Sequence, residues 1–526
     1  MNKYILFFVL SHFSILIIGQ TNAPLSHSYY SYLEKDMHEI GVSKHTSFKP
    51  FLYSVDDTIF YNSFKPIISK KSIIHAFLNS DLLSVKNVDY SFALNPLFHF
   101  EIGEDNGRRY INTRGMEVKG RVGEKLSFYS SFYENQMVLP NYLEDYVRNN
   151  DNVVPGKGMA KYNLIDQEGI MDFYYATGYI NYYVNKFFKL QLGHGKHFIG
   201  DGYRSMILSD NSFNYPYLKI TTAVWKLKYV NLFSYFQDIN LDIDLPNVSK
   251  SKFSAIHYLS ANVGERLNIG IFESIILAED SLGSVFDINY INPVIFYRPV
   301  EYSIGYSRYG NALLGLSLKY KITSTSHLYG QLVLDEFRLD DFRAQNGAWR
   351  NKYGGQVGMK YFNAFGFEHL TLQSEFNFAR PFTYSHFNPL QNYAHYAQPL
   401  AHPLGTSFLE NVSFIRYRKD RWTADLKLIH AKYGGEIAGD TTNYGSDIFI
   451  SYNENFKELG NNIAQGNTSN LRITDIRVGY IVNPKTNMKI ELGISNRSLN
   501  DRNTSTDNQY LFFSFKTDLQ NFYYDF

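Results

Sequence analysis

IRVGYIVNPKTNMKIELGI, from Ile476 to Ile494, is the stretch that decides the fold. Apolar side chains occupy every second position on both sides of its central turn, and mostly Arg, Lys, Glu and Gly stand between them. Successive side chains of a β-strand point to opposite faces, so each half presents one apolar face and one polar face. The stretch therefore predicts an antiparallel hairpin that is apolar on one side. GMEVKGRV, from Gly115 to Val122, has the same alternation.

Connection lengths separate a membrane barrel from a soluble sandwich. Tight turns are predicted near Gly123, Asn185, Leu227, Gly264, Ser324, Ala364, Lys419 and Pro484. Between them lie longer polar connections near 138–170, 196–217, 238–252, 278–311, 339–352, 380–410, 434–472 and 498–507. Outer-membrane barrels combine short periplasmic turns with long outer loops, whereas sandwiches have no reason to keep this alternation. The pattern predicts an all-β, transmembrane antiparallel outer-membrane β-barrel.

The number of strands follows from the same pattern. About seventeen strands can be counted from Arg114 to a last strand at Gln509 to Leu519, with Leu511, Phe513 and Phe515 facing outward. Single-chain bacterial barrels have an even number of strands. We therefore add one strand near Leu97 to Ile102, joined to the next by an outer connection at 103–113, which gives about eighteen strands.

Composition narrows the function classes. Among 526 residues, 51 Lys and Arg balance 50 Asp and Glu, so the charge gives no reason to expect nucleic acid as a partner. Aromatic residues make up 17% of the chain, which suits the aromatic girdles of a membrane barrel as well as a Tyr-rich soluble β-protein. The absence of cysteine excludes disulfides, thiolate metal sites and a lipidated N-terminal Cys.

The N-terminal residues predict export. Lys3 precedes an apolar run from Tyr4 to Ile18 that is too short to cross a bilayer comfortably. We expect a signal peptide at 1–19, cleaved after Gly19 or after Ala23, and a location in the cell outer membrane. Residues 20–90 lack clean alternation and predict a small periplasmic or plug region, and 91–526 predict the barrel.

One candidate site is the charged run from His194 to Arg204. His194, His197 and Asp201 are suitable metal ligands, but strand positions i and i+3 point to opposite faces, so we predict no metal. Glycines in the run let the chain bend into the lumen, where Lys196, Asp201 and Arg204 could form an internal charge network. The same three groups are candidates for contact with a polysaccharide.

A second candidate is the connection at 380–410. Its prolines stiffen the loop, and its aromatic and imidazole groups suit the faces and hydroxyls of sugars. We expect this loop to lie outside the cell and to contact glycan through Tyr393, His395, Tyr396 and His402. The alternative is an ordinary folded loop or part of an aromatic girdle.

Several longer strings resemble the gliding-motility protein RemB family of Bacteroidetes, which is related to Wzi-like capsule-assembly barrels. They are GHGKHFIGDGYRSMILSDN (Gly193 to Asn211), PYLKIT (Pro216 to Thr221), INPVIFYRPVEYS (Ile291 to Ser303), NALLG (Asn311 to Gly315), NYAHYAQPLAHPLG (Asn392 to Gly405), INTRG (Ile111 to Gly115) and ENQ (Glu134 to Gln136). The Wzi-like link is carried by Leu208 to Asn211, which adds Asp210 and Asn211 to the candidate ligand-binding residues. The resemblance implies a barrel that serves gliding motility or surface-polysaccharide attachment.

The expected partners are outer-membrane lipid, surface polysaccharide and motility or secretion proteins. No G-x-S-x-G or H-E-x-x-H string occurs, so we expect neither enzymatic activity nor a cofactor. Two alternatives remain. A general diffusion porin is one, because barrels of this size can leave an aqueous channel. An outer-membrane hydrolase is the other, because a catalytic set could be assembled from distant strands.

Overall fold

The computed structural model describes residues 20–54, 64–70, 72–162, 169–239, 249–279, 285–294, 296–297, 299–300, 310–454 and 456–526. The predicted signal peptide at 1–19 lies outside these residues, as do parts of the connections near 238–252 and 278–311.

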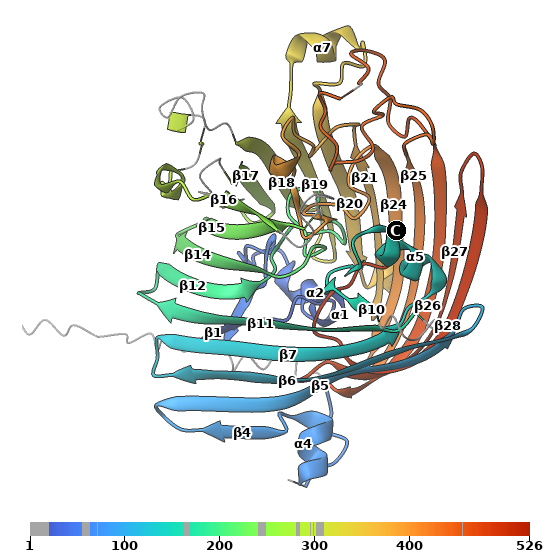
Figure 1. Cartoon of the computed structure of the whole chain (residues 1–526). Helices are drawn as coiled ribbons and strands as arrows, with labels where there is room; N and C mark the ends of the chain where they lie inside the picture. Colours follow the sequence, from blue (N-terminus) through green and yellow to red (C-terminus); the bar gives the residue numbers. More distant parts are fainter. Residues whose placement is uncertain are drawn as a thin grey trace, which may run out of the picture.

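One antiparallel sheet forms a closed ring (Figure 1). Of its 20 strands, the short strands β4 and β10 only extend an edge, which leaves 18 in the ring. The ring closes where β28 pairs with β5, from Leu511 opposite Glu104 to Lys516 opposite His99. The strand number and the closed antiparallel topology confirm the predicted barrel. The ring strands are β5 (Tyr90–Glu104), β6 (Arg108–Val122), β7 (Leu126–Val138), β11 (Met171–Tyr183), β12 (Phe188–Gly195), β14 (Tyr215–Val224), β15 (Leu227–Asp238), β16 (Lys250–Val263), β17 (Leu267–Ala278), β18 (Asn311–Lys321), β19 (Ser326–Glu336), β20 (Lys352–Phe362), β21 (Leu370–Ala379), β24 (Phe408–Lys419), β25 (Trp422–Tyr433), β26 (Ser469–Asn483), β27 (Met488–Asn500) and β28 (Ser505–Thr517).

Smaller elements lie inside the ring or at its two ends. The short strands are β1 (Gln20–Asn22), β2 (Phe48–Lys49), β3 (Leu52–Ser54), β4 (Leu83–Lys86), β8 (Val153–Val154), β9 (Gly158–Met159), β10 (Lys161–Tyr162), β13 (Phe198–Ile199), β22 (Ala394–His395) and β23 (Gln398–Pro399). The helical elements are α1 (His27–Tyr30), α2 (Glu34–Met37), α4 (Ile73–Asn79), α5 (Asn141–Asn149), α7 (Leu339–Ala344), η1 (Ile288–Ile291), η3 (Ala364–Gly366) and η4 (Pro389–Gln391). None of the helices in the described ranges is both long and apolar enough to cross a membrane.

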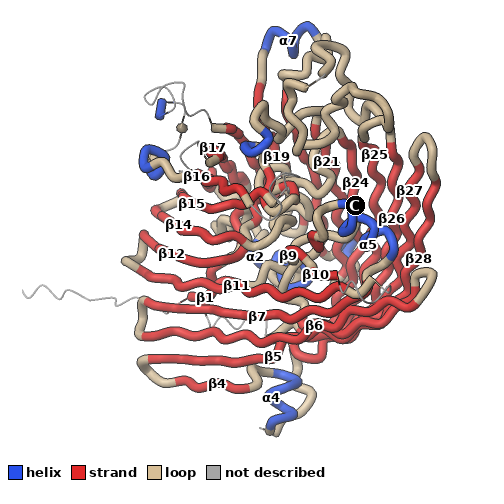
Figure 2. Tube along the Cα trace, in the orientation of Figure 1, coloured by secondary structure: helices blue, strands red, loops and turns tan. Residues whose placement is uncertain are grey.

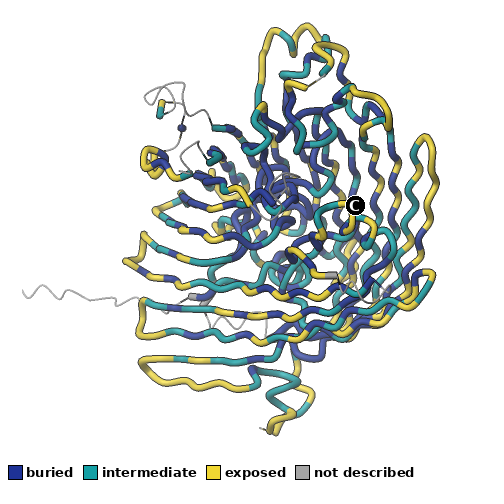
Figure 3. The backbone as a smooth tube through the Cα atoms, in the orientation of Figure 1, coloured by how far each residue is buried: buried dark blue, intermediate teal, exposed yellow. Residues whose placement is uncertain are grey.

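The hairpin predicted from Ile476 to Ile494 forms as expected between β26 and β27. On β27, Ile490 and Leu492 are 39% and 57% exposed, whereas Lys489 and Glu491 are 7% and 2% exposed. The apolar face therefore points outward and the charged face points into the barrel. The same alternation of exposed and buried positions runs along other ring strands (Figure 3). An apolar band of this kind on the outside of a closed sheet suits lipid and would be costly in water.

The first hairpin differs from the prediction. We expected a strand at 97–102 and a long connection at 103–113, but β5 and β6 pair along their whole lengths and leave only Asp105 to Gly107 as a turn. Asn106 and Gly107 both have positive φ angles, 48° and 134°. An Asn-Gly pair adopts such angles readily and permits a tight hairpin. The Asn-Gly signal was therefore present in the sequence.

The interior of the ring is filled by chain segments (Figure 2). Residues 20–54, which carry α1 and α2, lie inside the ring and bond to side chains of ring strands (Figure 1). Lys360 of β20 donates to Glu34 of α2 over 2.6 Å, and the side-chain amide of Gln191 of β12 donates to the side-chain oxygen of Asn22 over 3.1 Å. We expected the barrel to extend to residue 526, but the last strand ends at Thr517. Residues 518–526 turn back into the lumen, where Asp525 meets Lys427.

An outward charge should be costly within the apolar band of the barrel wall. Replacing Ile490 with Arg is expected to lower the free energy of unfolding by about 2–4 kcal/mol, because it places a cation in the apolar outward band, which Ile490, Leu492 and Ile494 form on this strand. The matched control is Asn496→Arg, which lies on the same face of β27 beyond this apolar run and should cost only about 0–1 kcal/mol. Unfolding titrations in lipid vesicles measure both. Equal costs at the two positions would mean that β27 does not cross the membrane as described.

Candidate functional site

Three segments that join or follow ring strands bring the predicted site residues into the lumen. They are the connection 196–214 between β12 and β14, the connection 380–407 between β21 and β24, and the terminal segment 518–526. Lys196, Asp201, Arg204, Asp210 and Asn211 lie on the first of them. Tyr393, His395, Tyr396 and His402 lie on the second.

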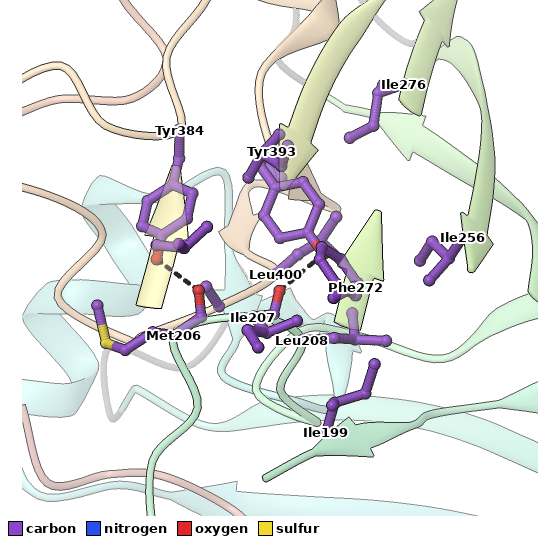
Figure 4. Close-up of a cluster of buried hydrophobic side chains, with 14 of the residues drawn as sticks. Ile199, Met206, Ile207, Leu208, Ile256, Phe272, Ile276, Tyr384, Tyr393 and Leu400 are labelled. Carbon is purple, nitrogen blue, oxygen red and sulfur yellow. Dashed lines mark hydrogen bonds between the residues drawn. The ribbon is translucent and has the colours of Figure 1, made fainter. Parts of the chain in front are cut away.

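The two connections pack against each other through backbone groups. Tyr384 and Tyr393 donate their hydroxyls to the carbonyls of Met206 and Ile207 over 2.7 and 2.8 Å (Figure 4). The Ser209 amide donates to the Leu400 carbonyl over 2.7 Å. The expectation that 392–405 faces the outside is therefore wrong. The loop folds inward because its tyrosines satisfy carbonyls of the 196–214 connection and its apolar residues join one buried cluster.

His395 and His402 both act as internal hydrogen-bonding groups. The Gln237 amide donates to Nδ1 of His395, and the Nε2 of His395 lies 3.2 Å from the Asn214 carbonyl. Burial lowers the pKa of His395 to about 3, so the ring is neutral and one nitrogen donates while the other accepts. Nε2 of His402 lies 2.6 Å from a carboxylate oxygen of Glu410. Tyr396 is only half-buried, and its ring packs on Phe213.

Arg204 is the most strongly held of the predicted residues. Its side chain is 1% exposed, and its guanidinium contacts Glu410 of β24 and Asp525 of the terminal segment, each over 2.9 Å. Burial alone would lower the pKa of Arg204, but Asp525 and Glu410 hold it well above its ordinary value. Lys427 adds a second ion pair to Asp525 over 2.7 Å. Burial alone would raise the pKa of Asp525, but these two cations keep it well below its usual range.

A glycine permits the close approach of this connection to the barrel wall. A Cβ on Gly202 would lie 2.6 Å from a carboxylate oxygen of Glu375. That carboxylate accepts the backbone amides of Tyr203 and Arg204. Any side chain at position 202 would therefore displace the wall group that fixes the connection.

Asp201 links the 196–214 connection to the N-terminal segment. Its carboxylate accepts hydrogen bonds from the hydroxyls of Thr46 and Ser47, both over 2.6 Å. His38 and Lys319 each lie 3.7 Å from it. Burial would raise the pKa of Asp201, but the charge of Lys319 and the nearby His38 imidazole hold it well below its ordinary value. Asp201 is thus an ionised internal acceptor.

Lys196, Asp210 and Asn211 also have internal partners. The Lys196 ammonium donates to the carbonyls of Gly156 and Asp210. The carboxylate of Asp210 accepts from Asn521 over 2.9 Å and from the Tyr523 hydroxyl over 2.8 Å. Asn211 donates to the Pro399 carbonyl. Lys196, Asp201 and Arg204 therefore take part in internal networks as one of our two interpretations expected, but each has its own partners.

The candidate metal ligands have separate surroundings. His194 lies next to the Ala176 carbonyl, His197 between Tyr215 and Lys219, and Asp201 next to Thr46. Throughout the described ranges, no group of three or more His, Asp or Glu side chains is arranged to hold a metal ion.

A cavity of about 280 Å³ remains between the terminal segment and the inner faces of β5–β7 and β24–β28. Its lining extends from Lys489 and Asp518, near the short-turn end of β27, to Arg497 near the opposite end. Aromatic rings and charges of both signs line it. The rings include Phe98, Tyr133, Tyr142, Tyr175, Phe414, Tyr510, Phe512, Phe522, Tyr523 and Tyr524. The charged groups are Lys157, Arg416, Arg418, Lys427, Arg477, Lys489, Arg497, Lys516, Glu101, Asp425, Asp475, Glu491, Asp518 and Asp525.

None of the nine predicted site residues lines this cavity. Lys196 and Asp210 instead border a smaller cavity of about 100 Å³ beside residues 21–25. The polar halves of the alternating strands were the available signal for the larger cavity, since Lys489, Glu491 and Arg477 occupy inward positions predicted from the sequence. The segments that enter the lumen decide which of these charges line the cavity. The sequence does not predict the course of those segments, so it could not predict the lining.

Comparison with solved structures places this barrel among known ones. It matches the outer-membrane protein Wzi of Escherichia coli, a carbohydrate-binding β-barrel involved in group 1 capsule assembly, with a TM-score of 0.53, 11% identity and coverage of 94% of this chain and 99% of Wzi. OprD of Pseudomonas aeruginosa matches with a TM-score of 0.43, 9% identity and coverage of 80% and 94%. OccAB2 of Acinetobacter baumannii matches with a TM-score of 0.43, 9% identity and coverage of 82% and 99%.

The identity to Wzi is low, so this likeness shows a shared outer-membrane barrel fold. No protein-family model matches the chain. No curated protein sequence matches it either. The resemblance to the RemB family therefore stays a prediction.

Removing the Arg204 guanidinium should destabilise the filled lumen. Arg204→Met leaves Glu410 and Asp525 buried without their main cation, and breaking a buried pair in this way costs about 3–5 kcal/mol. The control is Arg148→Met, whose ion pair with Glu144 is half-exposed on α5 and should contribute less than about 1 kcal/mol. Urea unfolding of the purified barrel in detergent compares them. A loss for Arg204→Met no larger than for the control would contradict the role given to this network.

Proposed function

We propose that this protein is a non-catalytic outer-membrane barrel that holds surface polysaccharide, in capsule or exopolysaccharide attachment and assembly or in gliding motility. The observation that carries the proposal is the cavity between the terminal segment and β24–β28, a lumen space bordered by aromatic rings and by cations and carboxylates. Aromatic rings pack on the apolar faces of sugars, and charged and amide groups bind their hydroxyls. A volume of this size is at the lower end of small-ligand sites and suits a short piece of a glycan.

The shared fold is consistent with this role. The matched barrel Wzi binds carbohydrate and takes part in capsule assembly. The apolar outward band gives this chain an outer-membrane lipid partner, and export through the predicted signal peptide would bring it there. Motility or secretion proteins are further partners that the RemB resemblance suggests.

A diffusion porin is the less favoured alternative. A porin needs a continuous aqueous path, whereas chain segments lie inside the ring (Figure 2), among them residues 20–54, 196–214, 380–407 and 518–526, which bond to the wall or to one another. Buried ion pairs join these segments to the wall and to one another. A hydrolase is the second alternative, and it would need a nucleophile, a base and a group that orients the base.

Conductance separates a filled barrel from a porin. We expect the purified protein to give no stable open steps in planar bilayers, because the ion-paired segments stay in the lumen. A variant that carries both Arg204→Met and Asp201→Asn should show transient openings, since it weakens the attachment of the 196–214 connection to two other segments. Stable large conductance from the unmodified protein would favour the porin.

Polysaccharide retention tests the cavity. Phe522→Ala removes a ring that lines it and should reduce retention of surface polysaccharide by whole cells about fivefold, since such a ring contact contributes about 1 kcal/mol. The control Phe187→Ala removes an exposed ring from the turn between β11 and β12 and should change nothing. Heat-modifiable gel migration checks that both variants give normal amounts of folded barrel. Normal retention by Phe522→Ala would reject this cavity as the binding site.

A further inference from the structure

Lys157 is a buried cation in an unusual setting. It lies between β8 and β9 in the connection that follows β7, and its side chain lines the cavity although the residue is only 2% exposed. Its ammonium lies 4.4 Å from the centre of the Phe522 ring. Within the described ranges the ammonium makes no hydrogen bond and no ion pair. Burial of an ammonium without an anionic partner is costly, so this position calls for one.

The other cations of the cavity differ from Lys157 in this respect. Lys427 pairs with Asp525, Lys489 with Asp518 and Lys516 with Glu491, all over 2.6–2.8 Å. Arg416 and Arg418 share Asp425, and Arg477 pairs with Asp475. The lining holds eight Lys and Arg against six Asp and Glu, which leaves a surplus of two cations. These pairings account for every lining cation except Lys157 and Arg497.

Arg497 resembles Lys157 in its surroundings. Its guanidinium lies over the Tyr142 ring, 4.6 Å from the ring centre, and its Nε donates to the Phe526 carbonyl. No described Asp or Glu side chain lies within ion-pair distance of it, and the Phe526 oxygen, which belongs to the last residue of the chain, is bonded to Nε alone, so both Nη groups lack an acceptor among the described residues. Tyr142 donates to the Tyr524 carbonyl, and the rings of Tyr524 and Phe522 stack 6.2 Å apart. The stacked rings of Phe522 and Tyr524 and the nearby ring of Tyr142 thus lie between two cations, Lys157, which has no anionic partner, and Arg497, whose Nη groups have none.

From this arrangement we infer that the cavity binds a saccharide that carries anionic groups, with Lys157 and Arg497 as the anion contacts and Phe522, Tyr524 and Tyr142 as the surface for the sugar rings. The inference rests on the proposed polysaccharide function and names its substrate class. A bound carboxylate or phosphate would neutralise the surplus positive charge, and the rings would exclude water from the contact. A neutral glycan would leave the Lys157 ammonium without an anionic partner.

The protonation of Lys157 gives the site a pH dependence. Burial lowers its pKa to about 7, with Glu101 of β5 opposing this effect and Lys196 and Lys516 adding to it. Free Lys157 is therefore charged at pH 6 and mostly neutral at pH 8.5. Affinity for an anionic sugar should fall over this range, whereas Lys157→Arg, which stays charged, should bind with little change.

Calorimetric titration of the purified barrel in detergent tests the inference. The probes are digalacturonate for the carboxylate form, its methyl ester as the uncharged match, and maltose 1-phosphate for the phosphate form. We expect one or both anionic probes to bind at least tenfold more tightly than the ester at pH 6. Lys157→Met and Arg497→Met should each weaken that binding about tenfold, as is typical for a lost charged hydrogen bond. The control Lys186→Met, in an exposed turn, should bind normally.

The outcomes separate this inference from the proposed function. Equal affinity for digalacturonate and its ester, or unchanged affinity in both Met variants, would overturn the anionic site. Neither result would contradict the proposed function, which the cellular retention assay tests separately. Binding that depends on Lys157, in a protein whose deletion leaves cellular polysaccharide retention normal, would support the site and contradict the proposed function. Heat-modifiable migration of each variant excludes loss of folding as the cause of weaker binding.

Discussion

The guanidinium of Arg204 joins three parts of the chain that are far apart in sequence. It sits on the connection after β12 and contacts Glu410 of β24 and Asp525 of the terminal segment. A fully buried charge needs its partners, and removing one leaves the others uncompensated. The 196–214 connection and the terminal segment therefore depend on each other to stay inside the lumen. Asp201 makes a comparable link from the same connection to Thr46 and Ser47 of the N-terminal segment.

This dependence explains why a barrel with so many inward charges is filled. Alternation places Lys, Arg, Asp and Glu on the inner wall, and in an open barrel water would solvate them. Here the inward segments supply many of the partners instead, as Glu34 does for Lys360 and Asp525 for Lys427. The tyrosines of the 380–407 connection bind backbone carbonyls of another connection, which otherwise would be buried unsatisfied. Each segment thus completes the hydrogen bonding of its neighbours.

The wall of this protein could be predicted from its sequence because its signals are local. Ile490 and Lys489 are adjacent, and their alternation alone fixes which one faces lipid. The tight turn at Asn106 and Gly107 was also predictable, because an Asn-Gly pair is a strong local hairpin signal, whereas an even strand number does not fix the length of the connection. The contents of the lumen were not predictable in this way. The partner of the Tyr393 hydroxyl is the Ile207 carbonyl, 186 residues away, and a Pro- and Tyr-rich loop has the same composition whether it lies outside or inside.

The same reasoning applies to the cavity. Nothing near Lys157 in the sequence indicates that it is buried, because its burial depends on Phe522 at the other end of the chain. Most charges in the lumen have an ionic partner. A cation that lacks one therefore indicates where an anionic ligand could bind. Phe522 and Asp525 lie three residues apart on the segment that borders this cavity. A ligand held by Phe522 and the ion pair of Asp525 with Arg204 would therefore favour the same course of that segment, so binding would stabilise the filled state of the barrel.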